Sequence, residues 1–199
     1  MRKKRKYIIG IDEVGRGPLA GPITFCALAV PKNWEYKITE LKPRDSKKLS
    51  PKKREEFFAV CGQLKKKGII NYSLASASNC QIDKKGLSFC IKKCVGECLK
   101  KLNLKYGEVL VLLDGGLKAP ESYKNQRTII KGDEKEPIIS LASIIAKVSR
   151  DKKMVGFSQK FPEYGLEKHK GYGTKEHYKN IKKYGLSKIH RQSFYRGQR

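Results

Sequence analysis

The sequence predicts an α/β fold around a single sheet of mixed strand direction. Two apolar segments, residues 7–11 and 23–30, are separated by a short glycine-rich loop, so they can pair antiparallel. Segments with helical spacing separate the later strands. Residues 109–113 (Val-Leu-Val-Leu-Leu) form a continuous apolar run, which is typical of a strand covered on both faces. Helices are therefore expected on both sides of the sheet.

The first strand is short and buried because residues 7–11 are mostly β-branched or aromatic. Gly15, Gly17 and Gly21 follow in the loop to the second strand, and glycine can take a positive φ and admit another backbone closely. Residues 31–43 are expected to be a connection.

Ser50 and Pro51 predict the start of a helix, because serine caps free N–H groups and proline suits the first turn. This helix is expected to run to about Lys67. Residues 69–78 alternate in polarity and predict a third strand.

A core helix of roughly twenty residues is expected to begin at Asn79 or Asp83. Its predicted inward residues follow helical spacing: Leu87, Ile91, Cys94, Val95, Cys98 and Leu102. After the strand at 109–113, residues 127–131 predict a fifth strand. The turn at 132–137 should leave Asp133 and Glu134 solvated.

Residues 138–157 are expected to form a further helix, and Thr174 to cap a last helix that Gly185 closes. The chain shows no repeat, linker or domain break, so we expect one domain over 1–199. Within it, 1–6 would be a flexible basic arm and about 160–199 a helical C-terminal portion.

The chain is strongly basic, with 45 Lys and Arg against 19 Asp and Glu, a net charge of +26. Such an excess favours a polyanionic partner, and nucleic acid fits better than a membrane. A basic protein that only coats RNA, or a lysine-rich genome, would give the same composition. No apolar run is long enough for a membrane span or a secretory signal, so a cytoplasmic location is expected. The chain is also expected to be a monomer.

Cysteine and histidine do not predict a metal centre. Cys90, Cys94 and Cys98 are spaced four apart, so a helix would stack them on one face as buried free thiols. A zinc or iron–sulfur site is the weaker alternative, because no Cys-x-x-Cys spacing occurs. The three histidines, His169, His177 and His190, are expected to be surface or structural residues.

Acidic residues follow two of the predicted strands. Asp12 and Glu13 come after the first, and Asp114 after the fourth, each beside glycine. Carboxylates at strand ends are costly unless they bind or pair with a cation, and ligands gather at such ends in open α/β sheets. Arg16 and the glycine N–H groups beside them could accept an anion. Metal-assisted phosphoryl chemistry is the resulting hypothesis.

The motif from Asp12 to Pro22 (DEVGRGPLAGP) resembles the opening motif of ribonuclease HII, the type 2 ribonucleases H. Further matching motifs are DSKKL at 45–49, LDG at 113–115, ASIIAKVSRD at 142–151, HKGYGTKEH at 169–177 and HRQSF at 190–194. The resemblance extends from residue 7 to about residue 194. It implies a ribonuclease H-like fold of five strands, the first three antiparallel, with the C-terminal portion as the second wall of a substrate groove.

The resemblance also implies the catalytic acids and metals. Asp12, Glu13, Asp114 and Asp151 would hold two Mg²⁺ or Mn²⁺ ions. Asp151 is expected on the inward helix face of Ile144 and Val148. The implied reaction cleaves the RNA strand of RNA/DNA hybrids, or nicks duplex DNA 5′ of an embedded ribonucleotide, leaving 3′-hydroxyl and 5′-phosphate ends.

Substrate-binding residues are implied in the same way. Gly15, Arg16 and Gly17 would read the 2′-hydroxyl, which distinguishes RNA from DNA. Tyr172 would test the next sugar. Contacts to the nucleic-acid backbone are implied for Ser46, Lys47, Ser143 and Lys147.

Two alternatives stay open at this point. Ribonuclease HIII is the nearer one, although the Gly-Arg-Gly-Pro segment and the lack of an extra N-terminal domain disfavour it. A non-enzymatic RNA-binding protein is the more distant one. Leu141 departs from the small residue expected there, and no clamp-binding tail is expected after the last motif.

Overall fold

The computed structural model describes residues 6–41, 43 and 49–195 of the 199-residue chain. The strands form one sheet in the order β3-β2-β1-β4-β5. Their bounds are β1 Tyr7–Val14, β2 Ile23–Pro31, β3 Asn71–Ala77, β4 Val109–Asp114 and β5 Gln126–Ile129. The first three strands pair antiparallel, and β4 and β5 run parallel to β1. The predicted mixed five-stranded sheet is therefore confirmed.

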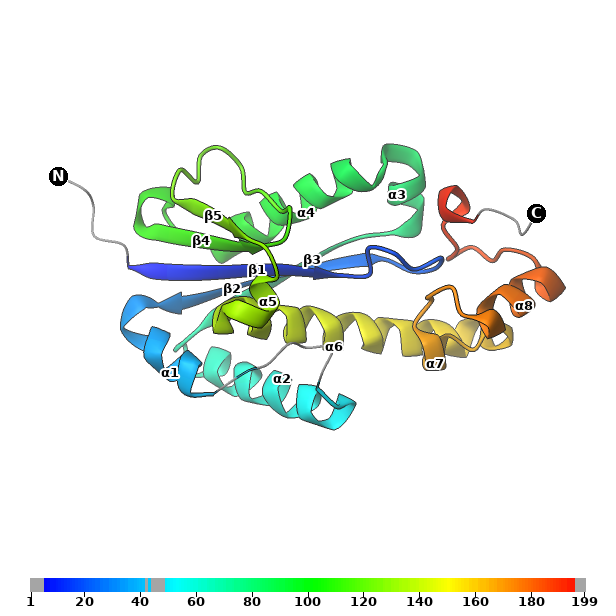
Figure 1. Ribbon diagram of the computed structural model, residues 1–199, viewed down its shortest axis with the longest axis horizontal. Helices are drawn as coiled ribbons and strands as arrows, with labels where there is room; N and C mark the ends of the chain where they lie inside the picture. The colour runs from blue at the N-terminus through cyan, green and yellow to red at the C-terminus, as the bar shows by residue number, and fades with distance from the viewer. Residues whose placement is uncertain (1–5, 42, 44–48, 196–199) are drawn as a thin grey trace.

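Helices cover both faces of the sheet, as Figure 1 shows. One face carries α3 (Asn79–Lys85) and α4 (Leu87–Leu102); the other carries α1 (Glu35–Glu40), α2 (Pro51–Lys66) and α6 (Pro137–Lys160), with α5 (Gly132–Lys135) just before α6. Beyond one end of the sheet lie α7 (Leu166–His169) and α8 (Lys175–Tyr184). In the described part of the chain, no helix is both long and apolar enough to cross a membrane.

Two helical segments differ from the sequence prediction, and the turn expected at 132–137 contains the short helix α5. The single long helix expected after Asn79 is two helices, because Gly86 adopts a φ of 80° and a ψ of 156°, which no helix can accommodate. The connection expected at 31–43 contains the short helix α1, which buries Ile38 against the sheet side of α6. The prediction that Cys90, Cys94 and Cys98 lie on the inward face of one helix is confirmed, because all three are buried free thiols of α4.

The long helix α6 lies directly on β1 at Gly10. A Cβ atom built on Gly10 would stand 2.6 Å from the backbone carbon of Ile138, closer than real Cβ atoms approach. The missing side chain therefore lets α6 come against the middle of the sheet. As a result, the later residues Ser143 and Lys147 of α6 reach the carboxyl end of β1, where Asp12 is located.

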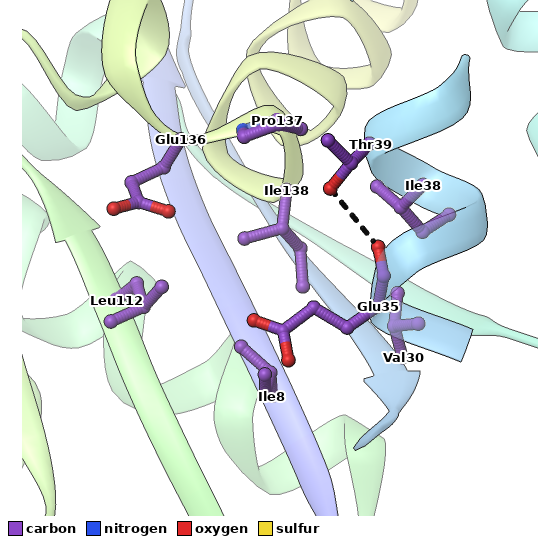
Figure 2. Close-up of a pocket in the computed structure, with 9 residues that line it drawn as sticks. All are labelled: Ile8, Val30, Glu35, Ile38, Thr39, Leu112, Glu136, Pro137 and Ile138. Carbon is purple, nitrogen blue, oxygen red and sulfur yellow. Dashed lines mark hydrogen bonds between the residues drawn. The ribbon is translucent and has the colours of Figure 1, made fainter. Parts of the chain in front are cut away.

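A small hollow lies at the other end of β1, between α1 and the start of α6 (Figure 2). Apolar side chains such as Ile8 and Leu112 form its floor, and the carboxylates of Glu35 and Glu136 face it. Its volume of about 40 Å³ admits a few water molecules but no nucleotide. Asp12 and Glu13 lie at the opposite end of β1.

The C-terminal portion contains a buried histidine cluster and packs around an apolar cluster that also includes Leu19, Ala20 and Met154. His177 and His190 are 0% and 2% exposed, and their Nε2 atoms are 3.0 Å apart. His169 stacks on His177 with ring centroids 4.4 Å apart. Of the two expectations, surface or structural, the structural one holds for His177 and His190, which are buried. Burial lowers the pKa of His177 to about 4 and also lowers the pKa of His190.

These lowered pKa values predict acid-sensitive stability. The unfolded chain binds a proton at each histidine near pH 6.5, whereas folded His177 stays neutral until about pH 4, so stability is lost as the pH falls through that window. For His177 the loss should reach about 2 kcal/mol at pH 5. Urea unfolding at pH 7.5 and pH 5 measures it. The His177→Gln variant should lose this part of the pH dependence; an unchanged dependence would contradict the assignment.

Candidate active site

Three of the predicted acids meet at one hollow. Because β1 and β4 are adjacent and parallel, Asp12, Glu13 and Asp114 emerge at the same edge of the sheet. They line an open cavity of about 220 Å³. The other side chains and backbone around this cavity come from the glycine loop, from α6 and from the C-terminal portion: Val14, Gly15, Arg16, Gly17, Ser143, Lys147 and Tyr172.

Asp12 is the most deeply buried of these acids, with 4% of its surface exposed. Burial raises the pKa of its carboxyl group well above the ordinary value, and the neighbouring charges of Glu13 and Asp114 raise it further. A hydrogen bond with Ser143 and the backbone N–H of Glu13, 2.7 Å from Asp12 Oδ1, act in the opposite direction. The carboxylate is therefore held in a fixed position at an electrostatic cost.

Among the residues that the structure describes, one carboxylate oxygen of Glu13 has no partner. Its Oε1 accepts from Arg16 Nη1 at 3.3 Å, but Oε2 is buried and receives no hydrogen bond from the described part of the chain. Burial raises the pKa of Glu13; the charge of Arg16 lowers it, while that of Asp114 raises it again. A buried oxygen of this kind costs free energy unless a further cation or donor meets it.

Asp114 is held by the start of α5. The backbone N–H of Gly132 donates to Asp114 Oδ1 at 2.6 Å, and the N–H of Asp133 approaches the same oxygen at 3.4 Å. A side chain at position 132 would press on this arrangement, because its Cβ would stand 3.2 Å from Asp114 Oδ1. The carboxylate of Asp114 is thus fixed by the chain that follows β5.

Asp133 corrects the sequence analysis. It was expected to be solvated in a turn, but it is only 6% exposed, whereas its neighbour Glu134 is exposed as expected. Asp133 is buried because α5 folds back against the end of β4. The sequence contained a signal for this position. Asp133 follows the fifth strand and is preceded by Gly132, while Asp114 ends the fourth strand and is followed by Gly115. The two strands, β5 and β4, are parallel neighbours.

Asp151 does not join the other acids. The carboxylate accepts from Lys147 Nζ at 2.8 Å and lines a separate open groove between α2, α6 and α7. Asp151 lies one turn beyond Lys147 on α6, and Lys147 borders both this groove and the acidic hollow. The expected convergence of four acids that included Asp151 is therefore not seen, because the helix carries Asp151 past the hollow.

The predicted substrate-binding residues divide into those at the hollow and those that lie elsewhere. Gly15, Arg16 and Gly17, together with Tyr172, line it, and Tyr172 is 41% exposed. Ser143 is buried there and Lys147 is partly exposed. Ser46 and Lys47 lie outside the described residues.

The acids at the hollow fit a hard divalent cation. Their donors are all carboxylate oxygens, which suit Mg²⁺ and Mn²⁺. The unpartnered Oε2 of Glu13 and the raised pKa of Asp12 are both relieved by a nearby positive charge. Within residues 6–41, 43 and 49–195, no group of three or more His, Cys, Asp and Glu side chains is already arranged to hold a metal ion. Asp12, Glu13 and Asp114 would be the residues that hold the ion.

Comparisons with known proteins identify the family. The family model described as ribonuclease HII matches residues 9–197. A ribonuclease HII of Caldicellulosiruptor bescii is 46% identical over 189 residues, covering 95% of this chain and 86% of the relative. A ribonuclease HII of Clostridium beijerinckii is 43% identical, covering 95% of this chain and 67% of the relative.

Solved structures show the same fold. Ribonuclease HII from Archaeoglobus fulgidus, solved in a complex with PCNA, has a TM-score of 0.77 and 25% identity over 96% of both chains. A Bst ribonuclease HIII solved with Mn²⁺ has a TM-score of 0.72 and 21% identity, covering 96% of this chain and 68% of that one. The family match favours ribonuclease HII over ribonuclease HIII, and a hydrolase over a non-enzymatic RNA-binding protein. The chain therefore belongs to the ribonuclease HII family and is a ribonuclease H.

Proposed function

We propose that this endonuclease requires a divalent metal, cuts the RNA strand of RNA/DNA hybrids and nicks duplex DNA 5′ of a single ribonucleotide. The ends produced would be a 3′-hydroxyl and a 5′-phosphate. The observation that carries the proposal is the buried, unpartnered Oε2 of Glu13, in a hollow that Asp12 and Asp114 also line. The Mn²⁺ bound by the structurally similar ribonuclease HIII supports a divalent ion, as does family membership.

Asp12, Glu13 and Asp114 would hold Mg²⁺ or Mn²⁺, and we add Asp133 as the fourth acid. Asp133 is buried, and its backbone N–H lies 3.4 Å from the carboxylate of Asp114. Bound divalent ions supply Lewis-acid stabilisation of the negative charge that develops on phosphodiester oxygens during hydrolysis. Asp151, the acid first expected in this role, would instead hold Lys147 in place.

The chain's own polar groups orient these acids and the substrate. Ser143 and the N–H of Glu13 fix the Asp12 carboxylate, and Gly132 fixes that of Asp114. Lys147, at the border of the hollow, would attract a phosphate of the bound strand. The C-terminal portion of this one domain would form the second wall of the groove, since Tyr172 lines the hollow together with the acids.

Selection of ribonucleotides would depend on the loop and on Tyr172. Backbone groups of Gly15, Arg16 and Gly17 border the hollow and can approach a 2′-hydroxyl closely. Tyr172, between two glycines and 41% exposed, would stack on the neighbouring sugar. A single ribonucleotide followed by deoxyribose would then be accepted.

The two loop glycines should respond differently to substitution. A Cβ on Gly15 would stand 2.3 Å from Arg150 Nε at a φ of 91°, so Gly15→Ala should destabilise the protein by about 2–4 kcal/mol. Nothing lies within 4 Å of a Cβ on Gly17, so Gly17→Ala should leave stability within about 0.5 kcal/mol. It should nevertheless lower kcat/KM by about tenfold to a hundredfold, because the substrate backbone is displaced. Thermal unfolding and initial rates measure both; full activity of Gly17→Ala would contradict close approach at this position.

The experiment that tests the function uses a labelled DNA duplex with one embedded ribonucleotide. The protein is incubated with Mg²⁺ or Mn²⁺, with EDTA as control and an all-DNA duplex as matched substrate. A metal-dependent nick immediately 5′ of the ribonucleotide is expected. Binding without a cut in either metal would overturn the proposal.

A further inference from the structure

Two arginines are completely buried in the interior behind the acidic hollow. Arg150, on α6, and Arg191, near the C-terminus, are both 0% exposed. In the part of the chain that the structure describes, neither guanidinium takes part in an ion pair within 4 Å. Burying a positive charge in this way is costly, so the contacts that these groups make must compensate for it.

Both guanidiniums donate to the backbone of the glycine loop. Arg191 donates from Nη2 to the carbonyl of Gly15 at 2.6 Å, from Nη1 to that of Arg16 at 2.9 Å, and from Nε to that of Gly21 at 3.0 Å. The planar guanidinium presents its N–H groups in a fixed fork, so three carbonyl positions are set by one side chain. The loop that borders the acids is therefore fixed from behind.

Arg150 connects the same loop to the segment that carries Tyr172. It donates from Nε to Pro22 O at 2.8 Å, from Nη2 to Ala20 O at 3.2 Å, and from Nη1 to Lys170 O at 3.0 Å. Its Cζ atom also lies 5.8 Å from the centre of the Tyr172 ring. The side chain of Arg150 thus holds both the glycine loop and the Tyr172 segment, the two parts proposed to contact the substrate.

The backbone between the two segments is equally close. The N–H groups of Leu19 and Ala20 donate to Gly171 O at 2.8 and 3.2 Å. A Cβ on Gly171 would stand 2.5 Å from Ala20 O. The distance between the loop and the Tyr172 segment is therefore set by this direct backbone contact and by Arg150. Neither segment can shift far toward the other.

We propose that Arg150 and Arg191 are positioning residues that set the distance between the Gly15–Gly17 loop and Tyr172, and thereby the preference for a single ribonucleotide over a continuous RNA/DNA hybrid. The inference rests on the proposed function. A long hybrid presents a 2′-hydroxyl at every sugar, so the loop alone can engage it. A single ribonucleotide must place its 2′-hydroxyl at the loop and the next deoxyribose at Tyr172 simultaneously, which makes it the more sensitive substrate.

The test compares kcat/KM on the duplex with one ribonucleotide and on a continuous hybrid, and uses their ratio as the readout. Arg150→Lys and Arg191→Lys keep a positive charge and much of the volume but lose the fork of donors. Each should lower the ratio about tenfold or more, towards that of Tyr172→Ala. The double variant of Arg150→Lys with Tyr172→Ala should show the ratio of Tyr172→Ala alone, because Arg150 acts through Tyr172.

The control is Leu99→Ala in α4, which opens a cavity in the core on the opposite face of the sheet. It tests whether lost stability alone changes the ratio, and its ratio should stay at the wild-type value. Gly171→Ala keeps both guanidiniums but presses the Tyr172 segment away from the loop, so it should also lower the ratio; it replaces any arginine variant that does not fold.

The outcomes separate the inference from the proposed function. Wild-type protein that cuts neither substrate in Mg²⁺ or Mn²⁺ would overturn the proposed function and the inference together. Wild-type protein that prefers the single ribonucleotide, with arginine and Gly171 variants that lose activity on both substrates by the same factor, would overturn the inference alone.

Discussion

Replacing Asp12 with asparagine is expected to lower turnover by at least about a thousandfold while binding of an RNA/DNA hybrid is preserved. The lost carboxylate would remove several kcal/mol of the charge stabilisation that the proposed bound ions supply, and each 1.36 kcal/mol is about tenfold in rate. Binding should survive because the basic surface and the glycine loop are untouched. Single-turnover cleavage and gel-shift titration, both in Mg²⁺, measure the two quantities.

The same variant should be at least as stable as the wild type when no divalent metal is present. Asp12 is buried beside Glu13 and near Asp114, so a neutral side chain removes repulsion while its Oδ1 can still accept from the N–H of Glu13. Each kcal/mol gained in the free energy of unfolding should raise the unfolding midpoint by roughly 2–4 °C. Added Mg²⁺ should raise the midpoint of the wild type and have little effect on Asp12→Asn. Near-normal turnover, or equal Mg²⁺ stabilisation of both proteins, would contradict the assignment of Asp12 as a ligand.

The second large effect separates the two candidates for the fourth acid. Asp133→Asn should lower kcat by about a hundredfold or more and weaken Mn²⁺ binding measured by calorimetry, because Asp133 is buried and its backbone N–H lies 3.4 Å from Asp114 Oδ1. Asp151→Asn should lower kcat by less than about tenfold, because it removes only an ion pair with Lys147 whose side chains are 20% and 21% exposed, worth about 1 kcal/mol.

Glu134→Gln is the matched control for this comparison, since Glu134 is adjacent in sequence but exposed. It should change neither kcat nor Mn²⁺ affinity. The reverse ranking, with Asp151→Asn inactive and Asp133→Asn active, would restore Asp151 as the fourth acid. The side chain of Asp151 would then have to turn from its present position on α6 into the hollow.

Much of the site could be predicted because hydrophobic patterns locate buried strands well. The apolar run at 109–113 placed Asp114 at a strand end, and the strand before Asp12 did the same for the first acid pair. Parallel pairing then brings these ends together, which is a property of the sheet rather than of any local sequence. The same reasoning applied to the fifth strand would have found Asp133.

Other features depend on contacts that a local pattern does not encode. Gly86 divides a segment whose periodicity continues across it, and only the φ of 80° shows the break. Asp151 shares its helix face with apolar residues, but whether that face reaches the hollow depends on how far α6 extends along the sheet. Arg150 and Arg191 look like ordinary basic residues in a sequence with 45 Lys and Arg, and their burial follows from carbonyl partners far away in the chain.

The contacts of Arg191 have a consequence for the order of events during synthesis. Arg191 donates to the carbonyls of Gly15 and Arg16, and Ala20 pairs with His190 in an isolated bridge. At about 5–20 residues per second, roughly ten to thirty seconds separate the translation of the loop from that of the residues that hold it. A nascent chain therefore carries Asp12 and Glu13 early but cannot fix the Gly15–Gly17 loop until Arg191 has emerged, so the ribonucleotide selectivity proposed for this loop would be acquired only after that segment is made.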